Sequence, residues 1–311
     1  MADHQTLGRV ARLYYEHGLT QVEIAELLSV SRIKVTRTLA EARREGIVEI
    51  TVHSDAPAFG ELEQQLVSEL GLRHAWIAPA IEPGGSPSIP LGKTGARALR
   101  ELLPGSQRVV IGLSESVLRS LQELGDLKLK HLEVYPLAGG RSGRASGTDP
   151  GELGSTLAHH VGGTAFRLPA PLIASSAEAA HALMDTPGVR QTLEEAAAAD
   201  LMIVGIGGVT GTPSSYSSWA TADELAEVHQ LGAVGDISAH FFDSAGKSVV
   251  HDLDDRVVGL SLGQMASIRT RLAIAGGTHR LDAIRSAVSA GLVNALVTDT
   301  TVATALLEGP R

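Results

Sequence analysis

The sequence predicts an α/β protein in which a small helical domain precedes a larger domain built on a mostly parallel sheet. A chain of 311 residues is longer than one hydrophobic core usually supports, so two domains of unequal size are expected. Short apolar segments alternate with helical patterns along most of the chain, which is typical of a parallel sheet covered by helices. Aromatic residues make up only 3% of the sequence, so aliphatic side chains must form the core, as in buried parallel strands.

The composition excludes several classes of protein. The chain contains no cysteine, which excludes disulfides, thiolate zinc sites and cysteine nucleophiles. The first ten residues lack a signal-peptide pattern, and the strongly apolar segment 201–209 is too short to cross a bilayer. We therefore expect a cytoplasmic protein with no membrane partner.

The distribution of charge is more informative than the net charge of −9, which by itself argues against a nucleic-acid partner. Basic and acidic residues balance within residues 1–52, so the rest of the chain carries the whole negative charge. Residues 31–44 contain five basic side chains and one acidic side chain. This local excess of positive charge marks a candidate DNA surface.

The N-terminal segment has the periodicity of three short helices. Helices are predicted over residues 6–17 and 21–28, and a third helix, capped by Ser31, extends to residue 45 and is followed by a strand over 47–52. Thr20 and Glu23 form a capping-box pattern at the start of the second helix. Ser29 lies in the turn before the third helix, where a left-handed backbone would be mildly strained for a residue other than glycine. The arrangement predicts a helix-turn-helix domain over residues 1–53.

Two stretches of this domain carry a resemblance to a known family. The sequence QVEIAELLSVSRIKVTRTL (residues 21–39) and the continuation ARREGIVEI (residues 42–50) resemble the helix-turn-helix of the SorC family of bacterial sugar-responsive transcription regulators. In such motifs the start of the second helix reaches base edges, while flanking groups contact phosphates. The residues expected to read bases are Ser31, Arg32, Thr36 and Arg37, and those expected to contact phosphates are Lys34, Arg43 and Arg44. The alternative is an ordinary three-helix core with a solvated basic face.

A linker over residues 54–60 leads into the larger domain, residues 61–311, which begins with a helix over 61–70. The strands expected in this domain cover residues 74–77, 108–112, 132–137, 201–206, 256–260, 271–275 and 293–297. In a Rossmann-like sheet of this kind the ligand crevice lies outside the carboxyl ends of the strands. The loops that follow the strands are therefore the place to look for a binding site.

Glycine-rich segments at 112–116, 139–142, 205–208 and 276–280 follow such strands. Glycine permits close approach of an anion to backbone N–H groups. An arginine in these loops would hold the anionic end of a ligand, and a carboxylate would accept hydrogen bonds from hydroxyl groups. The expected effector-binding residues are Ser114, Glu115, Gly139, Gly140, Arg141, Ser142, Gly207, Gly208, Asp236, Gly276, Gly277 and Arg280. The alternative is that these glycines form ordinary tight turns, that Asp236 is a turn or capping residue, and that Arg280 lies at the surface.

The larger domain shares the resemblance. Residues 232–236, 241–243, 259–262, 275–277 and 291–299 resemble the effector-binding domain of the SorC family, which is similar in fold to sugar-phosphate isomerases and deaminases. The resemblance implies a phosphorylated sugar or polyol as effector, double-stranded operator DNA as partner and a homotetramer, with no cofactor and no metal. Where the family often has Ser-Trp-Gly, this chain has Ser114, Glu115 and Ser116, so a less usual or unphosphorylated carbohydrate is the alternative effector.

The residues support an enzymatic function less well than a regulatory one. The segment 112–116 misses a nucleophile elbow because Ser116 replaces its second glycine, and Thr210 replaces a glycine of a dinucleotide-binding motif. The histidines lack the spacing of a metal site. A sugar-phosphate isomerase or deaminase with an appended DNA-binding domain is the better enzymatic alternative, since such folds do not fix function.

Overall fold

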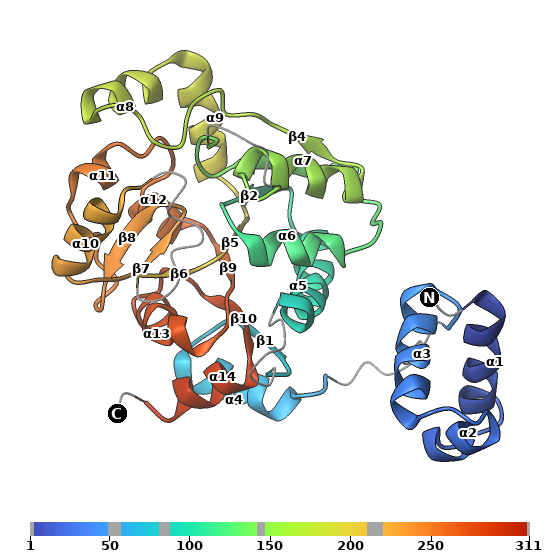
Figure 1. The fold of residues 1–311 in the computed structure, drawn as a ribbon. Helices are drawn as coiled ribbons and strands as arrows, with labels where there is room; N and C mark the ends of the chain where they lie inside the picture. Colours follow the sequence, from blue (N-terminus) through green and yellow to red (C-terminus); the bar gives the residue numbers. More distant parts are fainter. Residues whose placement is uncertain (1–2, 49–56, 81–87, 142–146, 210–219, 310–311) are drawn as a thin grey trace. The chain divides into compact units, whose positions relative to one another are not determined.

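The chain divides into two compact units, Met1–Ala56 and Pro57–Arg311 (Figure 1). The boundary lies inside the segment expected to be the linker, and the first helix of the second unit begins at Gly60, the last residue of that segment. The computed structural model describes residues 3–48, 57–80, 88–141, 147–209 and 220–309.

The N-terminal unit contains the three expected helices, α1 (His4–Tyr15), α2 (Gln21–Leu27) and α3 (Arg32–Arg44). Its core contains Val10, Ile24, Ala25, Val35 and Leu39. The caps form as expected: Thr20 and Glu23 make a reciprocal capping box, and Ser31 caps α3. Ser29 has φ 50°, the left-handed conformation expected of the turn. Residues 47 and 48 are not in a strand, so this part of the strand prediction is wrong, and its remainder lies outside the described residues.

The second unit alternates strands with helices, as the sequence predicts. From its start to the fifth strand, the unit contains α4 (Gly60–Leu70), β1 (His74–Ala78), α5 (Ser88–Leu102), β2 (Arg108–Ile111), α6 (Glu115–Gln122), β3 (Glu133–Pro136), α7 (Pro150–Val161), β4 (Thr164–Ala165), α8 (Ala177–Met184), α9 (Pro187–Ala197) and β5 (Leu201–Val204). The rest of the unit contains β6 (Gly207–Gly208), α10 (Ala222–Gln230), β7 (Ala233–Ile237), β8 (His240–Asp243), α11 (Asp252–Asp255), α12 (Leu262–Ser267), β9 (Thr270–Ile274), α13 (Leu281–Ser289), β10 (Ala295–Asp299) and α14 (Thr300–Leu307).

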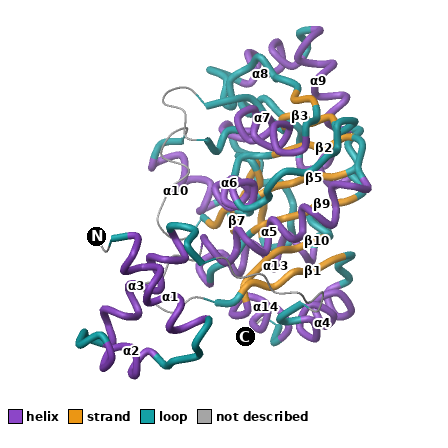
Figure 2. The backbone as a smooth tube through the Cα atoms, turned by 90° about the vertical axis from the view of Figure 1, so that its right-hand side faces the viewer, coloured by secondary structure: helices purple, strands orange, loops and turns teal. Residues whose placement is uncertain are grey.

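Seven strands form one parallel sheet in the order β1-β10-β9-β5-β2-β3-β4. Figure 2 shows most of these strands following one another in this order. Alternate residues of each strand enter opposite cores: Ile111 packs with α5, α6 and α7 on one face, and Val110 packs with the core that includes α4, α9, α13 and α14 on the other. The expected α/β class with a mostly parallel sheet is confirmed.

The strand order places a topological switch between β2 and β5. From β2 the chain proceeds to β3 and β4 on one side, and from β5 it proceeds to β9 and β10 on the other. The connections after these two central strands therefore diverge to opposite sides, and in open α/β sheets a crevice forms at the carboxyl ends of such strands. This is the position at which open α/β sheets bind ligands.

A small antiparallel sheet of β6, β7 and β8 was not predicted from the sequence. Strands β7 and β8 form a hairpin whose two-residue turn consists of Ser238 and Ala239, both with positive φ. The prediction of a strand over residues 256–260 is wrong, because these residues belong to neither sheet. Val257 and Gly259 make only isolated bridges, to Ile173 and Ala138.

Candidate functional site

The exposed face of α3 carries the residues expected to read DNA. The helix buries Val35 and Leu39 against the core of its unit, which leaves its opposite face in solvent. The residues exposed on or next to α3 include Ser31, Arg32, Lys34, Thr36, Arg37, Arg43 and Arg44. Ser31 accepts a hydrogen bond from the Lys34 N–H, so it is a cap whose hydroxyl proton remains available.

The basic residues of this face differ in their surroundings. None of Arg32, Lys34 and Arg37 forms an ion pair within the described residues. Arg44 is 3.4 Å from both Glu41 and Glu45, and its side chain is 68% exposed. Ion pairs of this kind on a surface contribute little, so Arg44 can exchange its partners for a phosphate.

Two residues of the same surface were missed in the sequence. Gln21 begins α2 and accepts a 2.7 Å hydrogen bond from Thr36 Oγ1. Ile33 follows Arg32 on α3 and is 66% exposed, although it is apolar. The signal for Gln21 was its place at the start of the first motif helix; the signal for Ile33 was that the helical period puts it outside the core stripe.

In the second unit, the loop after β2 lies against the loop after β5 at the topological switch. A methyl group on Gly205 would lie 2.5 Å from Ser114 Oγ, so the absence of a side chain permits this approach. Ser238, in the turn between β7 and β8, accepts a 3.1 Å hydrogen bond from the Leu113 N–H. Ser114 also caps α6 by accepting from the Val117 N–H. The hairpin and the two loops thus form one continuous surface.

The loop after β9 lies next to β6. A methyl group on Gly208 would lie 3.0 Å from the carbonyl oxygen of His279. The Gly277 N–H, however, donates to Asp299 Oδ2 at 2.7 Å, and Arg280 donates to the Gly276 carbonyl at 3.0 Å. Burial lowers the pKa of His279 and the charge of Arg280 lowers it further, so this imidazole is neutral at pH 7.

The loop after β3 holds the other candidates. The N–H groups of Gly139 and Gly140 donate to the carbonyls of Val258 and Ala170, so this backbone is already paired. Arg141 forms a 2.7 Å ion pair with Asp149, and the two side chains are 12% and 15% exposed. Ser142 lies outside the described residues. The two expected carboxylates, Asp236 and Glu115, also lie in different surroundings.

Asp236 and Glu115 occupy contrasting positions. Asp236 is 6% exposed, and its Oδ2 accepts from the Ala239 N–H at 3.1 Å, which stabilises the turn between β7 and β8. Glu115 is exposed at the start of α6 and lies 3.3 Å from Arg119. The structure brings the β2, β5, β9 and hairpin loops to one edge of the sheet, with Asp236 in a supporting position.

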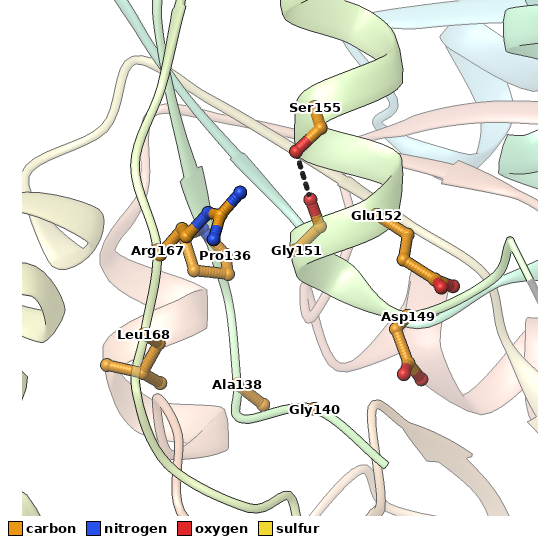
Figure 3. A pocket seen from close by; sticks show the side chains of 9 residues that line it. All are labelled: Pro136, Ala138, Gly140, Asp149, Gly151, Glu152, Ser155, Arg167 and Leu168. Carbon is orange, nitrogen blue, oxygen red and sulfur yellow. Dashed lines mark hydrogen bonds between the residues drawn. The ribbon is translucent and has the colours of Figure 1, made fainter. Parts of the chain in front are cut away.

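A cavity of about 500 Å³ lies at the same edge of the sheet, beside α7. Figure 3 shows Arg167 and Pro136 on one side, and Ser155, Glu152 and Asp149 along the start of α7 on the other. The lining residues are Pro136, Ala138, Gly140, Asp149, Gly151, Glu152, Ser155, Arg167 and Leu168. Only Gly140 among them was expected from the sequence.

The described part of the chain contains no cluster of three or more histidine or acidic side chains suited to a metal ion. Within the same residues, none of the helices has the length and apolarity needed to cross a bilayer.

Comparisons with known proteins agree with this two-part arrangement. Residues 57–308 match the family described as "Putative sugar-binding domain". The chain is 34% identical over 317 aligned positions to the transcriptional regulator LsrR of Escherichia coli strain SMS-3-5, which covers 99% of this chain and 96% of that protein. The relative of the same name from Enterobacter sp. strain 638 is 31% identical over 99% of this chain and 94% of its own length.

Solved structures show the same fold. The full-length sorbitol operon regulator SorC of Klebsiella pneumoniae superimposes with a TM-score of 0.76, at 24% identity and over 99% of each chain. A transcriptional regulator from Streptococcus pneumoniae TIGR4 gives a TM-score of 0.73 at 25% identity, over 80% of this chain and 96% of that one. The helix-turn-helix unit and the sugar-binding unit together define a transcription regulator. The chain belongs to the SorC family of sugar-responsive regulators.

Proposed function

We propose that the protein binds double-stranded operator DNA through α3 and that a phosphorylated sugar or polyol in the second unit controls this binding. The exposed face of α3 carries the proposal. Arg32 and Arg37 extend from this face without an acidic partner among the described residues, as a bidentate contact to guanine requires. Lys34, Arg43 and Arg44 are placed to contact phosphates on either side.

The effector site of this proposal is the crevice at the topological switch. Ser114 and Gly205 line it from β2 and β5, and the loop of Gly276, Gly277 and Arg280 closes it from β9. Glu115 is exposed at its rim and is placed to accept hydrogen bonds from hydroxyl groups. A ligand that stabilises one arrangement of these loops shifts the population of DNA-binding states.

We further propose that this unit senses its ligand rather than converts it. Asp236 is a buried carboxylate at this edge of the sheet, and it accepts from the Ala239 N–H in the hairpin turn, which favours a structural role. The named relatives are transcriptional regulators, which favours sensing. We also propose a cytoplasmic location, where operator DNA lies, and an oligomer, since symmetric half-sites disfavour a monomer; the family resemblance favours a homotetramer.

The test is a thermal-shift screen of the full chain against sugars, polyols and their phosphates, followed by DNA-binding assays. DNA fragments selected from a random pool with the protein serve as operator. A compound that both raises Tm and changes the Kd for this DNA supports the proposal, and light scattering reports the oligomeric state with and without it. A chain that selects no DNA sequence, or whose DNA binding no stabilising compound alters, contradicts it.

A further inference from the structure

The cavity beside α7 has walls of different chemistry. Pro136, Ala138 and Leu168 supply an apolar surface, and Ser155 and Glu152 follow each other along α7. Arg167 comes from the segment after β4, on the opposite side from the helix (Figure 3). A cavity of about 500 Å³ with a few convergent polar groups has the size and character of a small-molecule site.

Arg167 differs from the two arginines expected to hold an anion. Arg141 is paired with Asp149, and Arg280 donates to the carbonyl of Gly276. Within the described residues Arg167 has no hydrogen bond or ion pair, and its guanidinium extends across the cavity toward α7 in Figure 3. Binding an anion here breaks no existing contact, whereas Arg141 would have to leave its carboxylate.

The start of α7 supplies backbone N–H donors to the cavity, although the Glu152 carboxylate in the same turn is negative. The N–H groups of Gly151 and Glu152 belong to the first turn, which has no acceptor inside the helix. The N-cap residue Asp149 makes no side-chain hydrogen bond to them, because its carboxylate is bound to Arg141. Unpaired N–H groups at a helix start favour negative charge.

The acidic side chains set the orientation of the ligand. Glu152 accepts a 2.8 Å hydrogen bond from the Gly147 N–H, and its carboxylate points away from Arg167 in Figure 3. An anionic group would therefore be repelled at the Glu152 end and attracted at the Arg167 end. Hydroxyl groups suit the acidic end, since a carboxylate accepts their protons.

We propose that this cavity is a binding subsite for the anionic group of a small hydroxylated ligand, held by Arg167 at the end away from Glu152. The ligand class is a sugar phosphate or a sugar acid. The inference deepens the proposed function by assigning the anion to Arg167 rather than to Arg280 or Arg141. The cavity adjoins the switch-point loops. Asp149 lines the cavity, and the carbonyl of its neighbour Thr148 accepts a 3.4 Å hydrogen bond from the Ser114 N–H.

The first experiment does not depend on the identity of the effector. Phenylglyoxal modifies accessible arginines, and peptide mass spectrometry of the full chain measures the rate at Arg167. We expect inorganic phosphate at millimolar concentration to slow modification of Arg167 severalfold while leaving Arg190 unchanged, since Arg190 is an exposed arginine on α9 outside the cavity. Equal rates at Arg167 with and without phosphate overturn the subsite.

The second experiment uses calorimetric titration of glucose 6-phosphate, fructose 6-phosphate, gluconate and sorbitol. For any anionic compound that binds, Arg167→Ala should weaken binding roughly tenfold or more, as expected for a hydrogen bond to a charged group, and Arg190→Ala should not. Ser155→Phe, which fills the cavity from α7, should weaken the same compounds. Loss with phosphates alone, or with gluconate as well, distinguishes the two ligand classes. If Arg167→Ala binds an anionic compound with wild-type affinity, the inference is overturned. If the wild type binds such a compound through Arg167 but its affinity for DNA does not change, only the proposed function is contradicted.

Discussion

Thr36 Oγ1 donates a 2.7 Å hydrogen bond to Gln21 Oε1, which joins the first residue of α2 to the middle of α3. Thr36 was expected to touch a base, yet its hydroxyl is also within 3.0 Å of the Arg32 carbonyl. The bond holds the Gln21 side chain by its oxygen, so the NH2 group of the amide can donate to another partner. Both residues therefore belong to the proposed DNA-binding surface, Thr36 as a support and Gln21 as a donor.

Replacing Gln21 by Ala should weaken binding to all DNA sequences about fivefold, because one phosphate donor and the support of Thr36 are lost together. Fluorescence anisotropy with selected and random duplexes measures this. Gln191→Ala, on α9, is the matched control. A loss confined to one sequence would assign Gln21 to base reading instead.

Arg32→Ala and Arg37→Ala should cost about 1–3 kcal/mol of discrimination between the selected DNA and variants with a changed guanine. Lys34→Ala should weaken binding to every sequence and reduce the salt slope by about 1, as a lost phosphate contact does. Titrations at four salt concentrations separate the two effects. Unchanged affinity in both arginine variants would remove α3 from the interface.

Ile33 predicts a thymine contact. Its side chain is 66% exposed between Arg32 and Lys34, and apolar side chains in the major groove contact the thymine methyl group. Ile33→Ala should weaken specific binding about fivefold, the effect of losing one or two buried methyl groups. Deoxyuridine in place of the contacted thymine should weaken wild type similarly and leave Ile33→Ala unaffected. Additive losses would exclude a direct contact.

Glu224 predicts a pH-dependent contribution to stability. The Thr221 N–H lowers the pKa of this carboxyl, and Arg256 lowers it further. A carboxyl whose pKa is lower in the folded state stabilises the fold above its unfolded pKa of about 4.3, and this is lost as the pH falls through the folded pKa. Glu224→Gln should therefore cost about 1 kcal/mol of unfolding free energy at pH 7, and this cost should shrink as the pH falls below about 4.3. Urea unfolding at several pH values tests this, with Glu69→Gln on α4 as control.

Gly139→Ala should destabilise the second unit by about 3 kcal/mol or more, since the new methyl group would overlap the carbonyl oxygen of Pro171. The nearest atoms are all backbone atoms, so no flexible side chain can move out of the way. Gly188→Ala, in the first turn of α9, meets nothing within 4 Å and should be neutral or slightly stabilising. Thermal unfolding of the two variants compares them. Equal Tm values would show that the β3 loop relaxes.

Much of the fold could be predicted because its signals are local. Helix caps at Thr20 and Ser31 and the apolar segments of the central strands depend on residues a few positions apart. The β7–β8 hairpin could not be predicted. Its turn places Ser238 and Ala239 at positive φ, where asparagine and glycine are the usual signal. Tertiary contacts, among them the hydrogen bond from the Leu113 N–H to Ser238 Oγ, stabilise the turn instead.

The candidate site could be predicted only as a set of loops. Strand ends located the glycines, but the sequence did not show that Arg141 pairs with Asp149 or that Asp236 supports a turn. Arg167 was missed because it follows β4, a strand of two residues that carries no periodic signal. Which charges remain available to a ligand depends on these pairings between distant segments.

The pairing of β1 with β10 also fixes the order in which the protein can form during synthesis. Ala80, just after β1, donates to Thr300, 220 residues later, and among the described strands β1 pairs with β10 alone. The ribosome must therefore release nearly the whole chain before this edge can close, and until then the apolar residues of β1 lack their partner strand. The N-terminal unit has its own core within the first 56 residues. It can fold while the ligand-binding unit is still being made, so nascent chains acquire DNA-reading helices before they acquire a sensor.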